Sequence, residues 1–291
     1  MKAKVAIIVR TKDREQFLRR ALVDISKQTF SDYVVSIIND GGESSFIESC
    51  IPETIQSKTI VNHNPESLGM EAASNRAIGA VDSDYIVIHD DDDSWEANFL
   101  QKTVTYLEEK EHCNGVMTYS YLIYEKMIND RIQEVSKSEF HLQPEHISIS
   151  RMCEQNWFPP ISFLYRRSSY DTIGPYDERC EVLGDWDFNI RFLTEGSIDV
   201  IHLFLAKYHL RKVDKNTQKS SVNSVLADRR KFRVMDSFIR DKYFRLSISN
   251  PQKYGAIGLL LNLKMNSNLA REQEGNKGIL NRISSFIRNA K

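Results

Sequence analysis

Cysteine is scarce in this chain, which has four cysteines in 291 residues and no CxxC pair. This scarcity excludes a disulfide-stapled scaffold, and the lack of metal-ligand spacing excludes the common zinc sites. Reduced, mostly buried thiols are typical of cytoplasmic proteins, and we expect that location. The cysteines are Cys50, Cys113, Cys153 and Cys180.

Long apolar runs are also missing. No run approaches the roughly 20 residues that a membrane-spanning helix requires. The first residues, Met1–Val5, lead directly into a strand pattern and lack the apolar core of a secretion signal. There is no internal repeat, low-complexity tract or P-loop spacing. We expect a soluble protein, and its hydrophobic content of 41% suffices for one large domain or for a domain with a tail.

Net charge is nearly absent, at −1, but the charges are unevenly distributed. Residues 228–291 hold 14 Lys and Arg against 5 Asp and Glu, which leaves residues 1–227 with a net charge of −10. We expect a main domain at 1–227 and a basic helical extension at 228–291. The extension either binds an anionic partner, such as lipid headgroups at the inner face of a membrane, or packs on the acidic domain. We expect no nucleic-acid partner.

The most informative stretch that is present is Tyr85–Ile88 followed by Asp90–Asp93. The apolar residues predict a buried strand, and open α/β sheets bind ligands at the carboxyl ends of such strands. Like charges raise each other's pKa, so removing one carboxylate should relieve repulsion, and a bound cation would stabilise the run. Oxygen ligands suit Mg²⁺ or Mn²⁺. The alternative is a solvated acidic turn.

Two further strands are predicted before this stretch, at Val5–Val9 and Val34–Ile38, with an amphipathic helix between them. This βαβ unit places Thr11 and Asp40 at the same edge of the sheet. Asp40 and the two glycines after it form either a simple turn or a contact to a nucleobase.

A short strand is predicted at residues 58–61, and small residues predict a tightly packed helix from Met70 to Ala80. Asn75 and Arg76 are its conspicuous polar members, and a buried Asn needs hydrogen-bond partners. Ser94 is the expected N-cap of the next helix, whose inward residues are Phe99, Leu100, Val104 and Leu107.

Four segments together resemble family 2 glycosyltransferases of the GT-A fold, over roughly residues 4–215: Val5–Asp13, Ile37–Gly42, Leu68–Asn75 and His89–Trp95. The resemblance implies an α/β protein whose Rossmann-like, mostly parallel sheet is flanked by helices, followed by a C-terminal helical tail. It implies a nucleotide-sugar half at about 1–115 and an acceptor half at about 116–227.

The resemblance also implies transfer of a sugar, hexosyl or related, from a nucleoside diphosphate sugar to an acceptor hydroxyl. Transfer would proceed with inversion and a divalent cation, Mn²⁺ or Mg²⁺, in polysaccharide or glycoconjugate synthesis. A UDP-sugar is the default donor, and a glycan or lipid-linked molecule the acceptor. The DxD motif falls on Asp90 and Asp92, and the implied donor-binding residues are Thr11, Asp40, Asn75, Arg76, Asp90, Asp91 and His209.

Within this set the resemblance assigns the base to Asp40, the sugar and ribose side to Asp90, and the metal to Asp92, with Asp90 and His209 as further metal ligands. One departure is Ser74, which stands where the family often has an Arg. Arg76 lies just beyond, so it is the replacement that we expect for the lost base or diphosphate contact.

The second half begins with a predicted strand at Val116–Tyr124, after which residues 125–150 are polar and irregular, an insertion of unassigned role. Trp157 and Phe158 are the candidates for stacking on a sugar, although such residues are more often core, and Trp186 is a further acceptor-binding candidate beside Trp157. A mostly buried helix is predicted at Val182–Leu193.

Asp185 and Asp187 lie in the first turn of this helix, where the helix dipole alone could explain acidic residues. The resemblance instead makes Asp185 the general base, with Asp187 second, because a positioned carboxylate assists a weak hydroxyl nucleophile. The Glu that precedes this base in the family is Gly184 here. A late strand at Ala206–Arg211 carries His209.

Two other functions remain open. A nucleotidyltransferase is another metal-carboxylate enzyme, but its Gly-rich loop after the first strand is absent from Arg10–Asp13. A non-catalytic nucleotide- or carbohydrate-binding scaffold could keep the same fold. Retention of Asp90, Asp92 and Asp185 together argues against such a scaffold.

Overall fold

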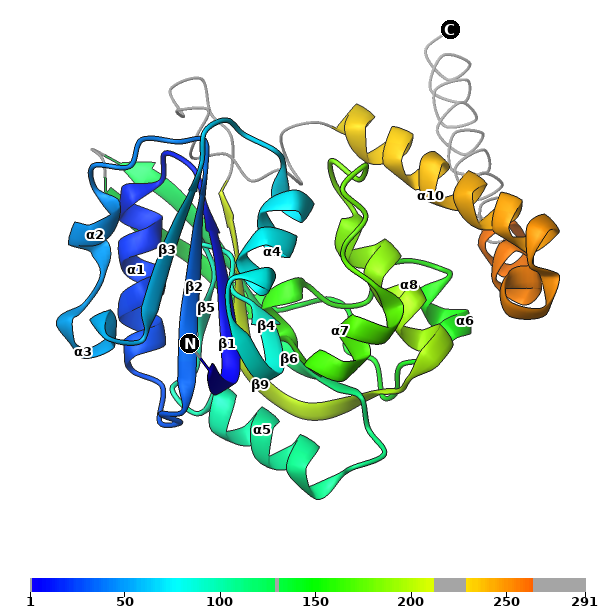
Figure 1. Cartoon of the computed structure of the whole chain (residues 1–291), viewed down its shortest axis with the longest axis horizontal. Helices are drawn as coiled ribbons and strands as arrows, with labels where there is room; N and C mark the ends of the chain where they lie inside the picture. Colours follow the sequence, from blue (N-terminus) through cyan, green and yellow to red (C-terminus); the bar gives the residue numbers. More distant parts are fainter. Residues whose placement is uncertain (1, 129–130, 212–228, 264–291) are drawn as a thin grey trace, which may run out of the picture.

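The computed structural model describes residues 2–128, 131–211 and 229–263 (Figure 1). Strands and helices alternate in the first half, as the sequence predicts. Its elements are β1 (Lys2–Thr11), α1 (Glu15–Ser26), β2 (Tyr33–Asp40), α2 (Ile47–Cys50), α3 (Glu53–Gln56), β3 (Thr59–Asn64), α4 (Met70–Gly79), β4 (Asp82–Ile88), β5 (Ser94–Trp95) and α5 (Phe99–Glu109).

The second half adds longer strands and the helices that cover one face of the sheet. Its elements are β6 (Gly115–Ile128), β7 (Arg131–Glu139), α6 (Ile149–Met152), the 3₁₀ turn η1 (Pro160–Ser162), β8 (Phe163–Arg166), α7 (Arg167–Ile173), α8 (Gly184–Glu195), β9 (Ile198–Arg211) and α10 (Arg229–Ser249), followed by a helix over residues 251–263.

The nine strands that the structure describes form one sheet, in the order β3-β2-β1-β4-β8-β6-β9-β5, with β7 paired to β6. The first four are parallel, β8 runs antiparallel to both of its neighbours, and β9 is parallel to β6. Thr11 pairs with Asn39, and Asp40 with Asn64. The predicted α/β class is confirmed, and Thr11 and Asp40 do lie at one edge of the sheet.

The continuous apolar runs are strands buried on both faces. In β1, Val5, Ile7 and Val9 pack with α1 and α5 on one face, while Ala6 and Ile8 pack with α4 and α8 on the other. Successive side chains of a strand point to opposite faces, so a strand in the middle of a three-layer fold must be apolar at every position. Helices therefore cover both sides of the sheet (Figure 1).

The described part of the C-terminal extension packs on the main domain beside α8 (Figure 1). Ile239 and Tyr243 of α10 are fully buried, in the same apolar cluster as Phe188 of α8. Packing on the domain, one of the two explanations for the basic tail, thus holds for residues 229–263. No helix in the described ranges is both long enough and apolar enough to cross a bilayer. The predicted boundary near residue 228 and residues 264–291 lie outside those ranges.

Two predictions about local structure were wrong. Ser94 does not cap a helix; it pairs with Lys207 in the short strand β5, and α5 begins five residues later at Phe99. The stretch 125–150 is not simply irregular, because β6 continues to Ile128 and pairs with β7. Most residues of β7 are exposed, so this strand lacks the alternation of apolar and polar residues that would have revealed it.

Candidate active site

The loop Asp90–Asp93 lies between β4 and β5, and its four carboxylates have different partners. Asp90, the least buried of the four, binds Arg10 near the end of β1, whose Nε donates to Asp90 Oδ1 at 2.9 Å. The same guanidinium reaches α4, where Arg10 Nη1 lies 3.4 Å from Met70 O and 3.2 Å from Ser74 Oγ. Arg10 therefore connects the acidic loop to the first turn of α4.

Asp91 and Asp92 are buried between arginines. Thr11 Oγ1 donates to Asp91 Oδ2 at 2.8 Å, and Arg14 Nη1 lies 3.1 Å from Asp91 and 3.3 Å from Asp92. Burial raises the pKa of Asp91 to about 6, against the opposing charge of Arg14. Burial acts in the same direction on Asp92, but the charges of Arg211 and Arg14 outweigh it and lower the pKa of that carboxyl. The cations among these carboxylates are thus supplied by the protein itself.

Asp93 and His209 belong to a buried network behind the loop. Asp93 Oδ1 accepts a hydrogen bond from the His209 backbone N–H at 2.9 Å. The His209 ring lies between Glu125, at 2.6 Å from Nδ1, and Ser94, at 2.8 Å from Nε2. Burial lowers the pKa of His209, although the hydrogen bond to Glu125 opposes this shift. Both ring nitrogens are used, so the structure corrects the prediction of His209 as a donor or metal ligand.

A first cavity, of about 330 Å³, lies at the carboxyl ends of the parallel strands. Its polar lining includes Thr11, Lys12, Arg14, Asp40, Asp90, Asp91 and Asp92. Acidic and basic groups thus meet in one cavity, which is lined by four of the predicted donor-binding residues and by the predicted metal ligand Asp92. This is the position that ligands take in open α/β sheets.

Asp40 forms the rim of this cavity opposite the acidic loop. Its carboxylate accepts four hydrogen bonds, from Asn64 Nδ2, Ser67 Oγ and the backbone N–H groups of Leu68 and Gly69, at 2.7–3.0 Å. Burial would raise the pKa of Asp40, but these hydrogen bonds outweigh it and lower it. A carboxylate has about four acceptor positions. Asp40 therefore holds the Ser67–Gly69 loop, and a nucleobase would have to replace one of these donors.

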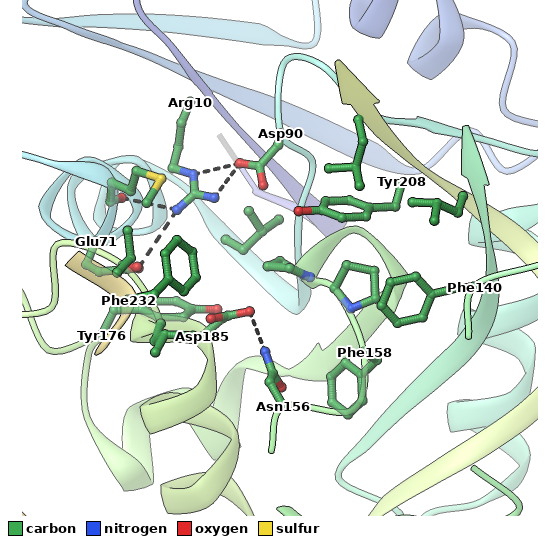
Figure 2. A pocket seen from close by; sticks show the side chains of 18 of the residues that line it. Arg10, Glu71, Asp90, Phe140, Asn156, Phe158, Tyr176, Asp185, Tyr208 and Phe232 are labelled. Atoms are coloured by element: carbon green, nitrogen blue, oxygen red, sulfur yellow. Dashed lines mark hydrogen bonds and ion pairs between the residues drawn. The ribbon is translucent and has the colours of Figure 1, made fainter. Parts of the chain in front are cut away.

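A second cavity, of about 370 Å³, adjoins the first and extends from Asp90 to α8 (Figure 2). Arg10, Met70, Asp90 and Tyr208 line both cavities, so the two form one continuous groove. The polar lining beyond Asp90 includes Glu71, Asn156 and Asp185, and the apolar walls include Phe140, Phe158 and Phe232. Phe232 comes from α10, so the C-terminal extension contributes to the wall of the groove.

Asp185 lies at the N-terminus of α8 with its carboxylate directed into the groove (Figure 2). Asn156 Nδ2 donates to Oδ2 at 2.6 Å, and the Trp186 N–H donates to Oδ1 at 2.9 Å. Burial raises the pKa of Asp185 to about 6 despite these hydrogen bonds. The preceding Leu183 has φ +62°, a conformation that non-glycine residues avoid. A strained residue at the start of α8 therefore helps to aim this carboxylate.

A family model described as Glycosyl transferase family 2 matches residues 6–174, more than half of the chain. The chain belongs to glycosyl transferase family 2. It is 28% identical over 189 residues to the uncharacterized glycosyltransferase YwdF of Bacillus subtilis, covering 65% of this chain and 67% of that protein. It is 27% identical over 210 residues to a PGL/p-HBAD biosynthesis glycosyltransferase of Mycobacterium bovis, covering 70% of this chain and 76% of that protein.

Solved structures of TarS residues 1–349 from S. aureus share the fold of this glycosyltransferase. The complex with UDP-GlcNAc superposes with a TM-score of 0.65 at 17% identity, covering 91% of this chain and 73% of that one. The complex with UDP gives a TM-score of 0.64 at 15% identity, covering 92% and 72%. The expected GT-A fold is thereby confirmed.

Besides His209, two predicted donor-binding residues of the transferase lie outside the groove. Asn75 connects α4 to α7 and to the loop that follows α7. Its side-chain N–H groups donate to Tyr176 O and Glu178 Oε1. Its Oδ1 accepts from the Tyr170 hydroxyl and the Tyr176 N–H. Arg76 is exposed and donates to Asn64 Oδ1 at 2.6 Å. Because Asn64 in turn binds Asp40, Arg76 supports the rim of the first cavity from behind. It does not replace the Arg missing at Ser74, whereas Arg10 reaches that position.

Three residues predicted for the acceptor side also lie elsewhere. Asp187 is fully buried on the far side of α8, where it pairs with Arg191 and Lys242, because residues two apart on a helix point in nearly opposite directions. Trp186 is 2% exposed, and its indole donates to Met152 O. Trp157 lines neither cavity and donates to Arg151 O. All three therefore have structural roles, whereas Phe158, the other residue expected to stack on a sugar, lines the groove.

Among the groove residues that were not predicted from the sequence are Arg10, Glu71, Asn156 and Tyr208. Arg10 carried a local signal, because it directly precedes Thr11 at the end of a buried strand. The other three carried none, since they come from separate segments that only the folded chain brings together.

The oxygen ligands of the acidic loop fit a divalent cation only in part. Among the described residues, no three His, Cys, Asp or Glu side chains converge to form a complete metal site. Asp90 and Asp92 nevertheless line the same cavity. Magnesium and similar ions commonly take one or two carboxylates and complete their coordination with substrate phosphates. The donor set therefore fits an ion that binds together with a phosphorylated ligand.

Proposed function

We propose that this family 2 glycosyltransferase moves a sugar from a nucleoside diphosphate sugar, by default a UDP-sugar, to an acceptor hydroxyl with inversion. The observation that carries the proposal is the continuous groove in which Asp90 lies at the junction of two cavities and Asp185 lies on the far side of the second. The TarS complexes with UDP and UDP-GlcNAc support this donor class. The mycobacterial relative is named a PGL/p-HBAD biosynthesis glycosyltransferase, which supports a biosynthetic role, and we propose polysaccharide or glycoconjugate synthesis.

The residues of the first cavity would bind the nucleoside diphosphate. Lys12 and Arg14 supply positive charge for the phosphates, and Thr11 and Asp91 fix the position of Arg14 and the loop. Asp90 and Asp92 would hold the divalent cation. A cation bound there would offset the negative charge that develops on the departing nucleoside diphosphate. The sugar would then lie at the junction beside Asp90.

Asp185 would act as the general base in the second cavity. Its carboxylate takes the proton of the acceptor hydroxyl as the hydroxyl oxygen forms its bond to the anomeric carbon. The bond from that carbon to the diphosphate breaks with its electron pair remaining on the diphosphate. One displacement of this kind inverts the anomeric centre. Asn156 and the Trp186 N–H hold the Asp185 oxygens in place for this step.

We also propose that the C-terminal helices contact an anionic membrane that presents a lipid-linked acceptor. The supporting observation is a stripe on α10, where Val234, Phe244 and Ile248 are 49–69% exposed and recur on one helical face with Arg230 and Arg233. Exposed apolar and basic side chains on one face are typical of helices that bind at membrane surfaces.

A thermal-shift screen of nucleoside diphosphates with and without Mn²⁺ tests the donor proposal. A ligand that binds only the folded state raises the unfolding temperature. We expect a rise with UDP and Mn²⁺ together that exceeds the rise with either alone. If no nucleoside diphosphate stabilises the protein in the presence of Mn²⁺, the donor proposal fails.

A further inference from the structure

Glu71 is a buried carboxyl group in the wall of the second cavity. It lies in the first turn of α4 and is 4% exposed, yet it lines the cavity between Arg10 and Asp185 (Figure 2). Its Oε2 atom is buried and has no hydrogen-bond partner in the protein. An unsatisfied buried polar atom is costly, on the order of 1–3 kcal/mol. Such an atom in a cavity wall requires an explanation.

A salt bridge to Arg10 explains Glu71 only in part. Arg10 Nη1 lies 3.8 Å from Glu71 Oε2, beyond hydrogen-bond distance, while Arg10 uses Nε and Nη2 on Asp90. Burial raises the pKa of Glu71 to about 8, against the opposing charge of Arg10. At neutral pH the group therefore carries a proton and can both donate and accept a hydrogen bond.

The first residue of α8, Gly184, has no side chain, and the Glu71 carboxyl occupies the space that a side chain would fill. A Cβ atom on Gly184 would lie 2.3 Å from Glu71 Oε1 and 2.4 Å from its Cδ, closer than non-bonded atoms approach. Gly184 directly precedes Asp185. The missing side chain at position 184 thus allows the Glu71 carboxyl to lie against the α-carbon next to Asp185.

We propose that the Glu71 carboxyl binds a sugar hydroxyl in the groove beside Asp185 and so fixes the position of the donor sugar or of the acceptor. The proposal rests on the proposed glycosyl transfer and names a specificity-determining residue of the same site. A hydroxyl group donates one hydrogen bond and accepts others, so it satisfies the unpartnered Oε2 and uses the carboxyl proton. Either source of the hydroxyl presents the same chemistry.

The variants Glu71→Gln and Glu71→Ala distinguish a hydrogen bond to the sugar from an electrostatic interaction between Glu71 and Arg10. Gln keeps the shape and the capacity to donate and accept a hydrogen bond, and Ala loses both, whereas neither side chain can carry the negative charge that an ionised Glu71 would place beside Arg10. The substrate is the nucleotide sugar that the wild type turns over fastest in a panel of UDP-, GDP- and dTDP-sugars. We expect Glu71→Ala to weaken binding of that nucleotide sugar, or to raise the KM for the acceptor, by about 10- to 100-fold. Glu71→Gln should stay within a few-fold of wild type.

Calorimetric titration with the free nucleoside diphosphate, which has no sugar, should give wild-type affinity for both variants. Loss of nucleotide-sugar affinity assigns the hydroxyl to the donor, and a raised KM for the acceptor alone assigns it to the acceptor. Glu53→Gln, an exposed carboxylate in the remote helix α3, is the matched control and should change neither quantity. Equal behaviour of the Gln and Ala variants, whether both intact or both impaired, would overturn the proposal.

A second variant keeps the test valid if Glu71→Ala fails to fold. Gly184→Ala should displace the Glu71 carboxyl and impair the same step, and it should do so to a similar extent in the Glu71→Gln background, because Gln occupies the same space. Wild-type kinetics for Gly184→Ala would contradict the close contact on which the proposal depends. A wild-type protein that turns over no nucleotide sugar would instead refute the proposed function itself.

Discussion

At the scale of single residues, the four consecutive carboxylates of the acidic loop have different environments. Asp90 faces the groove with Arg10, Asp91 and Asp92 lie between arginines, and Asp93 is held from behind by the His209 N–H. Sequence alone shows the four negative charges but not the positive ones, which come from β1, the loop after it and the end of β9. Electrostatic balance here is a property of the folded chain.

Asp92→Asn should therefore destabilise the protein, contrary to the expectation from repulsion alone. The change removes one of the two carboxylates that pair with Arg211, which is 1% exposed, and leaves Glu125 as the other. Loss of one member of a buried ion pair costs up to about 3 kcal/mol. The folded-state pKa of Asp92 is lowered, so its contribution is present above about pH 4 and disappears on acidification. Urea denaturation at pH 7 and at lower pH measures both effects.

Asp84→Asn is the matched control for that measurement, because Asp84 pairs with Lys4 on the surface and is 52% exposed. Exposed pairs contribute at most about 1 kcal/mol. Equal stability of Asp92→Asn and wild type at pH 7 would show that the arginines do not depend on Asp92.

The raised pKa of Asp185 predicts a pH dependence of catalysis. A general base must be unprotonated, and Asp185 loses its proton at about pH 6. We expect kcat/KM to fall roughly tenfold per unit below that pH and to level off above it. The affinity for the nucleoside diphosphate should be measured over the same pH range. Constant affinity would assign the loss of activity to protonation of the base, and falling affinity would assign it to loss of donor binding. A profile without an inflection between pH 5 and 7 would remove Asp185 from this role.

Several site residues were predictable because they lie at the ends of clearly patterned strands or helices. Thr11, Asp90, Asp91, Asp92 and Asp185 all line the groove. Asn75, Asp187 and His209 were misassigned for a common reason. Their residue types are common in active sites, but the direction in which each side chain points depends on tertiary packing. Asp187 differs from Asp185 only by a rotation of about 200° around the helix.

At the scale of elements, α8 carries the groove on one face and the C-terminal helices on the other. Lys242 of α10 binds Asp187 at 2.7 Å and Asp177 at 2.9 Å, and the Tyr243 hydroxyl donates to Asp187 O. The C-terminal extension therefore stabilises α8, the helix that carries Asp185. Sequence patterns revealed α8 and α10 as helices but not this contact, because their charges are complementary only in space.

Lys242→Ala should weaken this contact. It leaves the fully buried Asp187 with Arg191 alone, and an incompletely satisfied buried group costs about 1–3 kcal/mol. Lys253→Ala is the matched control, because Lys253 joins the last described helix to Glu195 of α8 through an exposed pair. We expect a lower unfolding temperature for Lys242→Ala than for Lys253→Ala. Equal unfolding temperatures would show that α10 contributes little to the stability of α8.

The strand β7 shows where patterns along a single chain reach their limit. Arg131–Glu139 is mostly exposed and polar, so its pairing with β6 depends on backbone hydrogen bonds that composition does not reveal. The buried strands β1, β2 and β4 were predictable because burial on both faces forces continuous apolar runs.

At the scale of the whole molecule, the charge asymmetry has two compatible consequences. The described C-terminal helices pack on the domain, yet α10 still exposes Val234, Phe244 and Ile248 beside basic residues. We expect the protein to co-sediment with anionic vesicles at low salt and to dissociate at high salt, because each basic residue near such a surface contributes about 1 kcal/mol.

Replacement of Phe244 and Ile248 by Ser should reduce this binding, whereas Val135→Ser, at an exposed apolar residue of β7, should leave it unchanged. Vesicles of neutral lipid are the second control. If the full-length protein does not co-sediment with anionic vesicles at low salt, the membrane proposal fails, and the C-terminal extension has only the packing role.

The central claim is that the groove between Asp90 and Asp185 performs glycosyl transfer. Its most direct test measures nucleoside diphosphate release from a panel of nucleotide sugars, with Mn²⁺ and acceptor, by wild type and by Asp185→Asn, alongside calorimetric donor binding. We predict release by wild type, a loss of about 10²- to 10⁴-fold in Asp185→Asn, and unchanged donor affinity, because the variant keeps the shape and loses the base. Equal release by the two proteins, or donor binding without any release by wild type, would contradict the account.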